Sequence, residues 1–263
     1  MANAQVWIGT SWKMNKTIDE AREYVTRLLA APSLSPDVQP FILPAHTALA
    51  AVRDCLAADD RLLLGAQNAH WEPEGAGTGE VSMRMVSDAG AKIVEMGHSE
   101  RRARFAETDD SVARKARAAL DHDLIPLICL GEPISERDAG RAESFVVDQL
   151  TAATALVDPG EVSRLLVAYE PIWAIGDGGR PAALAEVAPV IGALAAVIGE
   201  RSQTGRCRAL LYGGGVDPGN AGELLDGEHI DGLFVGRAAW NVTGFLELLE
   251  IGAAHAAVRR SHT

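Results

Sequence analysis

Three side chains capable of proton transfer follow short apolar runs at distant points of the chain. Lys13 comes directly after Trp12, His98 stands at the expected start of a helix, and Glu170 closes the apolar run Leu165–Tyr169. A carboxylate at the end of a buried strand is unfavourable unless it is paired or functional. The amino-terminal dipole of a helix keeps an imidazole neutral. Together, a carboxylate base, a neutral imidazole and an ammonium group can move a proton beside a carbonyl. Taken alone, Lys13 would fit a solvated surface lysine and His98 a structural residue.

Glycines gather in later loops that also follow apolar runs. Gly176 lies in the segment Pro171–Pro181, which begins rigid and apolar and continues with flexible glycines, a composition suited to a hinged lid or to an ordinary surface loop. Gly215 ends a glycine triplet, and Gly236 ends the next apolar run. Backbone N–H groups exposed at a strand-to-helix junction can bind phosphate. The triplet alone would also fit a tight turn.

Short β-branched runs alternate with alanine-rich segments of helical period along the whole chain. The expected strands are Val6–Gly9, Gln39–Leu43, Leu62–Ala66, Lys92–Met96, Ile125–Cys129, Leu165–Tyr169, Ala209–Tyr212 and Gly232–Val235. Helices are expected near 18–30, 46–57, 82–89, 110–121, 136–156, 182–200, 217–225 and 242–257.

This alternation predicts an α/β protein with one domain over residues 1–263, a closed (β/α)8 barrel. An open doubly wound sheet is the alternative, but that fold usually carries a G-x-G-x-x-G turn after the first strand, and the sequence has none there. Chemistry in a barrel lies in the loops at the carboxyl ends of the strands. Lys13, His98 and Glu170 all fall in such positions.

The net charge of −12 argues against a nucleic-acid partner or an anionic membrane surface, because both demand a basic face. A few local positive groups must therefore hold any anionic substrate. Cys55, Cys129 and Cys207 are widely spaced and form no C-x-x-C pair, which indicates reduced thiols in the cytoplasm. Cys129 is expected to be a packed strand-end thiol rather than a nucleophile.

Four motifs together resemble triosephosphate isomerase, in register over nearly the whole chain. They are Trp12–Asn15, Gly97–Arg102, Ala168–Gly176 and Tyr212–Gly214. The resemblance implies a TIM barrel that acts without a metal or cofactor and shifts a carbonyl along a short phosphorylated sugar through an enediolate. That enzyme is the standard example of a glutamate base beside a neutral histidine.

The resemblance also implies roles for individual residues. Glu170 would be the base, His98 the neutral electrophile and proton shuttle, and Lys13 the cation that supports the enediolate. Glu100, two residues past His98, would be a secondary carboxylate. The residues implied to lie against the phosphate are Gly176, Gly215 and Gly236.

Three residues depart from the family pattern and bear on the substrate. Ser11 stands where the family has asparagine, Gly215 where a serine contacts phosphate, and Arg237 where a second glycine is usual. The smaller Ser11 would leave room for an extra hydroxymethyl group, and Arg237 would restore charge near the phosphate. With these changes the chain looks like the branch of the family that isomerises erythrulose phosphates in tetritol breakdown. The expected reaction converts L-erythrulose 1-phosphate to D-erythrulose 4-phosphate.

Other functions remain open at this point. One is triosephosphate isomerase itself, acting in glycolysis and gluconeogenesis. A catalytically silent barrel is disfavoured because Lys13, His98 and Glu170 are all retained. A phosphate-binding barrel of amino-acid biosynthesis would lack the Gly-His-Ser-Glu helix start.

The loop Asn68–Gly79, which contains His70 and Trp71, resembles the loop by which the family forms dimers. A homodimer is therefore expected, with a simple surface loop as the alternative.

Overall fold

Eight parallel strands close into one barrel within residues 5–31, 34–57, 59–176 and 178–261, which the computed structural model describes. Each strand pairs with the next, and β1 pairs with β8 through the register Trp7↔Gly232 to Thr10↔Val235. The strands are β1 (Val6–Ser11), β2 (Val38–Leu43), β3 (Leu63–Ala66), β4 (Ile93–Met96), β5 (Ile125–Leu130), β6 (Leu166–Tyr169), β7 (Ala209–Tyr212) and β8 (Gly232–Val235). The predicted (β/α)8 barrel is confirmed.

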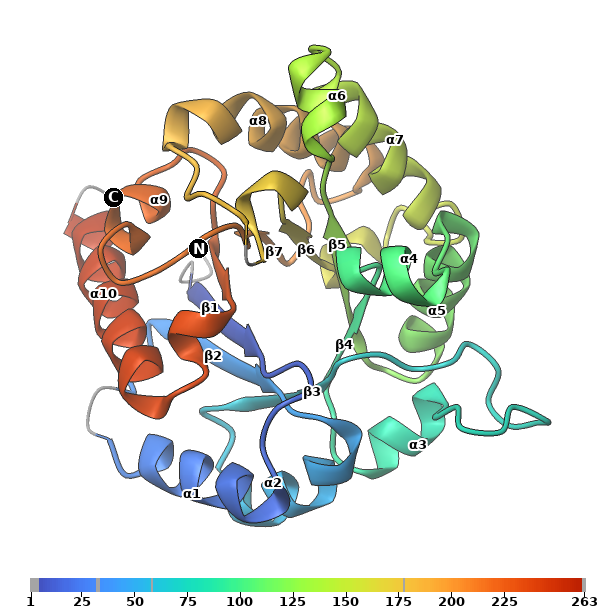
Figure 1. The fold of residues 1–263 in the computed structure, drawn as a ribbon, viewed down its shortest axis with the longest axis vertical. Coiled ribbons are helices and arrows are strands. Elements are labelled where there is room, and N and C mark those ends of the chain that lie inside the picture. Colours follow the sequence, from blue (N-terminus) through green and yellow to red (C-terminus); the bar gives the residue numbers. More distant parts are fainter. Residues whose placement is uncertain (1–4, 32–33, 58, 177, 262–263) are drawn as a thin grey trace.

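Helices surround the barrel on its outside (Figure 1). Those in the described ranges are α1 (Ile18–Leu29), α2 (Leu49–Leu56), α3 (Met83–Asp88), α4 (Ser99–Phe105), α5 (Asp109–Asp121), α6 (Ile134–Asp138), α7 (Ala142–Ala153), α8 (Leu184–Arg201), α9 (Ala221–Leu225) and α10 (Val242–Ser261). The single helix predicted near 136–156 was wrong. Gly140, with φ of +69°, interrupts it between α6 and α7, because that backbone conformation cannot continue a right-handed helix.

Alternate residues of each strand fill the barrel interior, while the others pack against the helices. The interior cluster comprises Trp7, Phe41, Leu43, Ile93, Leu127, Cys129, Leu166, Ala168, Ala209, Leu211 and Phe234. Gly9 faces this cluster, and a Cβ there would stand 1.9 Å from the Phe41 ring, so that only glycine fits. The strand β1 continues two residues beyond the predicted Val6–Gly9, and the alternation Trp7, Gly9, Ser11 carries Ser11 to the inner wall.

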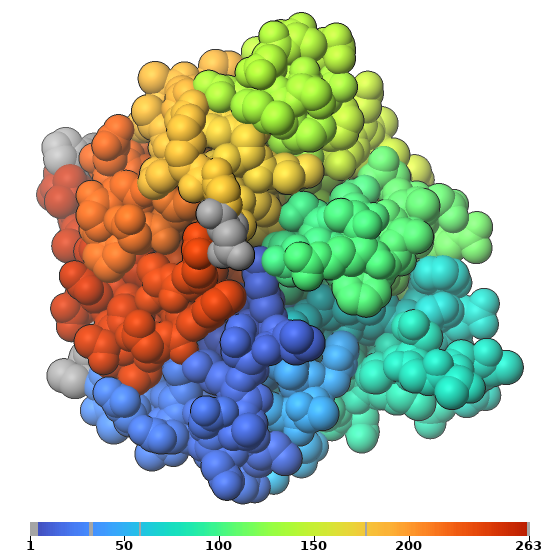
Figure 2. All heavy atoms as spheres, viewed as in Figure 1, coloured from blue at the N-terminus to red at the C-terminus, as the bar shows by residue number. Residues whose placement is uncertain are grey.

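The segments that follow β1, β4, β6 and β8 meet at the centre of one face of the molecule (Figure 2). This face lies at the carboxyl ends of the strands, where barrel chemistry was expected. Among the helices of the described ranges, none combines the length and the apolar character needed to cross a membrane.

Candidate active site

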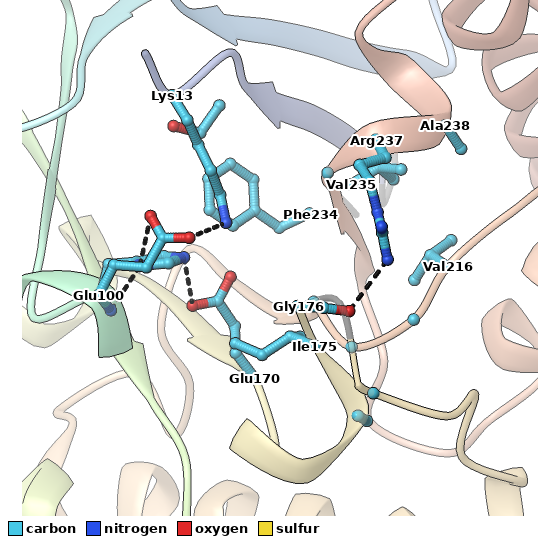
Figure 3. Close-up of a pocket in the computed structure, with 18 of the residues that line it drawn as sticks. Lys13, Glu100, Glu170, Ile175, Gly176, Val216, Phe234, Val235, Arg237 and Ala238 are labelled. Carbon is cyan, nitrogen blue, oxygen red and sulfur yellow. Dashed lines mark hydrogen bonds and ion pairs between the residues drawn. The ribbon is translucent and has the colours of Figure 1, made fainter. Parts of the chain in front are cut away.

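One cavity of about 490 Å³ at the carboxyl ends of the strands is lined by every site residue predicted from the sequence. Figure 3 shows Lys13, Glu170 and Arg237 around it. The predicted residues that line it are Ser11, Lys13, His98, Glu100, Glu170, Gly176, Gly215, Gly236 and Arg237. They come from five different strand ends, so only closure of the barrel brings them together. Asp177, within the predicted lid segment, lies outside the described residues.

Lys13 reaches into the cavity from the loop after β1 and binds Glu100. Its Nζ donates a hydrogen bond of 2.7 Å to Glu100 Oε1. Its backbone has φ of +53°, a left-handed conformation that is unusual for a residue with a side chain. Gln67 Nε2 donates to the Lys13 carbonyl at 2.9 Å and so holds this turn in place. Strain retained by such contacts is typical of functional sites.

The Glu100 carboxylate is partly exposed beside Lys13. Partial burial alone would raise the pKa of Glu100, but the hydrogen bond and the charge of Lys13 outweigh it and hold that pKa below its usual range. Glu100 therefore stays ionised and balances part of the Lys13 charge.

His98 caps the amino terminus of α4 with its own imidazole. Its Nδ1 accepts the Glu100 backbone N–H at 3.1 Å, which assigns the ring proton of the neutral form to Nε2. Burial, together with the positive charge of Lys13, lowers the pKa of His98 to about 4. The imidazole is therefore neutral at physiological pH, as the sequence predicted. Burial contributes more to this shift than the neighbouring charges do.

Glu170 directly follows β6 and lies across the cavity from His98. Its Oε2 is 3.7 Å from His98 Nε2, and this oxygen is buried without a hydrogen-bond partner among the described residues. Burial and the negative charge of Glu95 raise the pKa of Glu170 to about 8, against the opposing effect of the Lys13 charge. Gly213 makes room for the carboxylate, because a Cβ there would stand 2.8 Å from Glu170 Cγ. A dry carboxylate with a raised pKa can act as a base near neutral pH.

The opposite end of the cavity is formed by glycine backbone and one guanidinium group. Apart from their own chain neighbours, no described atom lies within 4 Å of where a Cβ would stand at Gly176 or Gly236, so their backbone is open to the cavity. Gly215 is fixed by Asn220, whose Nδ2 donates to the Gly215 carbonyl at 2.8 Å. Arg237 Nη2 donates to the Gly176 carbonyl at 3.0 Å (Figure 3). Open backbone beside a guanidinium group is suited to an anion such as phosphate.

The predicted lid segment is anchored at its start by Trp173. The indole Nε1 donates to Glu132 Oε1 at 2.7 Å. The guanidinium groups of Arg137 and Arg180 stack on the indole, with Cζ at 4.2 and 4.9 Å from the ring centroid. Glu186 binds both arginines, so the base of the segment is tied to α8. Motion of this segment stays a prediction.

Glu95 is a buried carboxylate that the sequence reasoning missed. It lies on β4, is 3 % exposed, and accepts a hydrogen bond of 2.9 Å from Ser11 Oγ. Burial raises the pKa of Glu95 to about 7, although the Ser11 hydrogen bond and the Lys13 charge act in the opposite direction. An acidic residue inside the predicted strand Lys92–Met96 is the same kind of signal as the Glu170 carboxylate that closes its own apolar run, so Glu95 was predictable from the sequence.

The described residues contain no group of three or more His, Cys, Asp or Glu side chains placed to hold a metal ion. Cys129 is buried in the barrel interior, and burial raises the pKa of its thiol well above its usual value. The ionisable side chains that line the cavity include the Glu170 carboxylate, the His98 imidazole and the Lys13 ammonium group.

Comparison with known proteins gives a consistent result over almost the whole chain. Residues 6–252 match the family model described as triosephosphate isomerase. A protein of Mycolicibacterium smegmatis named L-erythrulose-1-phosphate isomerase is 49 % identical over 254 residues, covering 96 % of this chain and 95 % of its own. A Rhizobium rhizogenes protein of the same name is 46 % identical over 259 residues, with coverages of 96 % and 97 %. The crystal structure of triosephosphate isomerase from Bartonella henselae superposes with a TM-score of 0.84 at 33 % identity, covering 94 % of this chain and 98 % of that one.

Proposed function

Because the chain belongs to the triosephosphate isomerase family, we propose that it interconverts L-erythrulose 1-phosphate and D-erythrulose 4-phosphate. The chain is a sugar-phosphate isomerase, and the observation that carries the proposal is the single cavity in which Lys13, His98 and Glu170 converge. A catalytically silent barrel would have no use for a strained lysine and a buried, unpaired carboxylate oxygen in the same cavity.

The proposed reaction begins with proton abstraction by Glu170. Its carboxylate removes the proton from C3 of L-erythrulose 1-phosphate while His98 Nε2–H donates to the carbonyl oxygen on C2. The resulting enediolate carries negative charge that Lys13 stabilises. His98 Nε2 passes its proton to the C2 oxygen and recovers one from the C3 hydroxyl, while protonated Glu170 returns its proton to C2. The carbonyl ends on C3, with no net gain or loss of atoms or electrons.

The proposed phosphate position is the glycine-lined end of the cavity. Backbone at Gly176, Gly215 and Gly236 would contact the phosphate, and the Arg237 guanidinium would supply local positive charge. Such a charge is needed because the chain as a whole carries −12. Glu100 would act through Lys13, by keeping the ammonium group oriented toward the reacting oxygens.

The four-carbon substrate is proposed from Ser11 together with the relatives' names. Ser11 lines the cavity where the family pattern has a larger amide side chain, which leaves space beside the reacting carbons. L-Erythrulose 1-phosphate carries an additional hydroxymethyl group on the carbon that loses its proton. The relatives named L-erythrulose-1-phosphate isomerase support the same substrate.

A homodimer is proposed from apolar side chains left uncovered near the cavity. Met14, next to Lys13, is 97 % exposed, and the loop Asn68–Gly79 projects away from the barrel beside α3 (Figure 1). His70 and Trp71 stack in that loop with ring centroids 4.1 Å apart. A second copy of the chain that covers Met14 with this loop would remove both features from water.

A reducing compartment such as the cytoplasm is proposed for the protein. Cys55, Cys129 and Cys207 are all free thiols. Cys129 and Cys207 are buried, so that neither is positioned for pairing with another molecule.

The direct test of the proposed activity is conversion followed by NMR in D₂O. The protein should convert L-erythrulose 1-phosphate to D-erythrulose 4-phosphate and incorporate solvent deuterium at the carbon that receives the proton. A preparation of the Glu170→Gln variant serves as the control for contaminating isomerase. Absence of conversion by the unmodified protein would overturn the proposal.

A further inference from the structure

Ser11 and Glu95 form a hydrogen bond that crosses the barrel beneath the cavity. Ser11 ends β1 and Glu95 lies on β4, and these two strands are not neighbours in the sheet. Both side chains are buried, and the second Glu95 oxygen, Oε1, accepts from the Cys129 thiol at 3.9 Å. Trp240 Nε1 donates to the Ser11 carbonyl at 3.0 Å and fixes the backbone at this point. The Ser11 hydroxyl is therefore oriented by Glu95.

The direction of this hydrogen bond determines what the Ser11 hydroxyl can offer to a ligand. An ionised carboxylate only accepts hydrogen bonds, so Ser11 must donate its single proton to Glu95. Of the two residues, Ser11 is the one that lines the cavity. It therefore presents only oxygen lone pairs there, and donation to a carboxylate makes those lone pairs better acceptors. The complementary ligand group is a hydroxyl that donates.

The charge distribution determines which end of a substrate meets Ser11. The buried Glu95 carboxylate disfavours a phosphate near it. The Arg237 guanidinium donates to the Gly176 carbonyl, on the side of the cavity formed by the loops after β6 and β8, whereas Ser11 and Glu95 come from β1 and β4. The phosphate-bearing end of a sugar is thus directed away from Ser11, and its hydroxyl-bearing end toward it.

We propose that Glu95 is a specificity-determining positioning residue, which holds Ser11 as the acceptor for the hydroxyl of the substrate's hydroxymethyl group. This inference rests on the proposed function, because a three-carbon sugar phosphate has no hydroxymethyl group on the reacting carbon. Glu95 touches no substrate atom in this account and acts through Ser11.

A comparison of two substrates in single and double variants tests the proposal. L-Erythrulose 1-phosphate is compared with its 4-deoxy analogue, in which a methyl group replaces the hydroxymethyl group, at pH 8.5 so that Glu95 is mostly ionised. The ratio of kcat/KM for the two substrates cancels effects on the base that are common to both. A hydrogen bond to a charged or polarised partner predicts a ratio of about 10–100 in the unmodified protein. Ser11→Ala and Glu95→Gln should each lower that ratio at least fivefold, and the double variant should lower it no further than Ser11→Ala.

The matched control is Thr10→Val, which removes a buried hydroxyl from the same strand on the side that faces away from the barrel interior. The kcat/KM ratio of Thr10→Val should equal that of the unmodified protein.

A kcat/KM ratio for Ser11→Ala within twofold of that for the unmodified protein would overturn the inference, even if Glu95→Gln does not fold. Additive effects of Ser11→Ala and Glu95→Gln would show that Glu95 does not act through Ser11. If the unmodified protein converts L-erythrulose 1-phosphate but shows no preference over the 4-deoxy analogue, only this inference fails. If it converts neither sugar, the proposed function fails as well.

Discussion

The imidazole of His98 faces the carboxylate of Glu170 through Nε2, and the two closest atoms lie 3.7 Å apart. That separation is too long for a hydrogen bond, so the two groups are not paired with each other. The same imidazole is fixed at its other nitrogen by the Glu100 backbone N–H. A substrate placed between the two groups would therefore have its carbonyl oxygen beside the His98 N–H and its acidic C–H beside the Glu170 carboxylate.

Shortening the base by one methylene group should separate catalysis from folding. Glu170→Asp moves the carboxylate oxygens by about 1 Å, and such a displacement lowers turnover about 100-fold or more. We expect kcat to fall by at least that factor while the circular dichroism spectrum and thermal midpoint stay close to those of the unmodified protein. Near-normal turnover by this variant would remove Glu170 from the mechanism.

The pH dependence of kcat/KM should report the raised pKa of Glu170. The base must be ionised to act, and its pKa is raised to about 8, so kcat/KM should rise with pH between about 6 and 9. Neutral His98, with a pKa lowered to about 4, adds no limb in this range. Glu95→Gln removes a negative charge that favours the protonated form of Glu170, so the limb should move to lower pH. Ionisation of the substrate's phosphate is the same for the unmodified protein and the variant, so it does not contribute to the difference. If the rise of kcat/KM occurs at the same pH in Glu95→Gln, Glu95 does not affect the pKa of Glu170.

The ion pair between Lys115 and Glu107 should contribute more to the free energy of unfolding than an exposed ion pair on α5, the helix that carries Lys115. Both side chains are buried, and Lys115 Nζ also donates to Asn68 Oδ1 at 2.8 Å, at the base of the projecting loop. Lys115→Ala leaves a buried carboxylate without this partner and should lower the free energy of unfolding by about 3–5 kcal/mol.

The neighbouring exposed residue Arg114, paired with Asp110, is the matched control. Arg114→Ala should lower the free energy of unfolding by less than about 1 kcal/mol. Urea unfolding at one fixed protein concentration compares the two variants. Equal losses would show that burial of the Lys115 pair contributes nothing.

Much of this architecture follows from the sequence, because the spacing of apolar residues and the position of turn residues determine the strands and helices locally. The predicted strand ends are sufficient to place Lys13, His98 and Glu170 on one face of a barrel. The pairing of Ser11 with Glu95 was not predictable in the same way, because it joins residues 84 positions apart and depends on how far β1 extends. The break at Gly140 was missed because a glycine inside a helical pattern is often tolerated, and its left-handed backbone is set by the surrounding fold.

A dimer should form through the exposed methionine beside the cavity. Light scattering at micromolar concentration should give about twice the chain mass of 27.8 kDa. Met14→Arg places a charge where a partner would bury an apolar side chain, and it should shift the protein toward the monomer. Leu156→Arg, at another exposed apolar position, should leave the dimer intact. A monomeric mass for the unmodified protein would refute the assembly.

The preference for a four-carbon substrate is measured most directly by the ratio of kcat/KM for L-erythrulose 1-phosphate to kcat/KM for dihydroxyacetone phosphate. A pocket that accommodates one extra hydroxymethyl group should favour the four-carbon sugar by about 10- to 200-fold. Ser11→Asn should move the ratio toward the triose by refilling the space beside the reacting carbons. Turnover of dihydroxyacetone phosphate near the diffusion limit, with negligible action on L-erythrulose 1-phosphate, would contradict the account and identify the chain as a triosephosphate isomerase with a variant first loop.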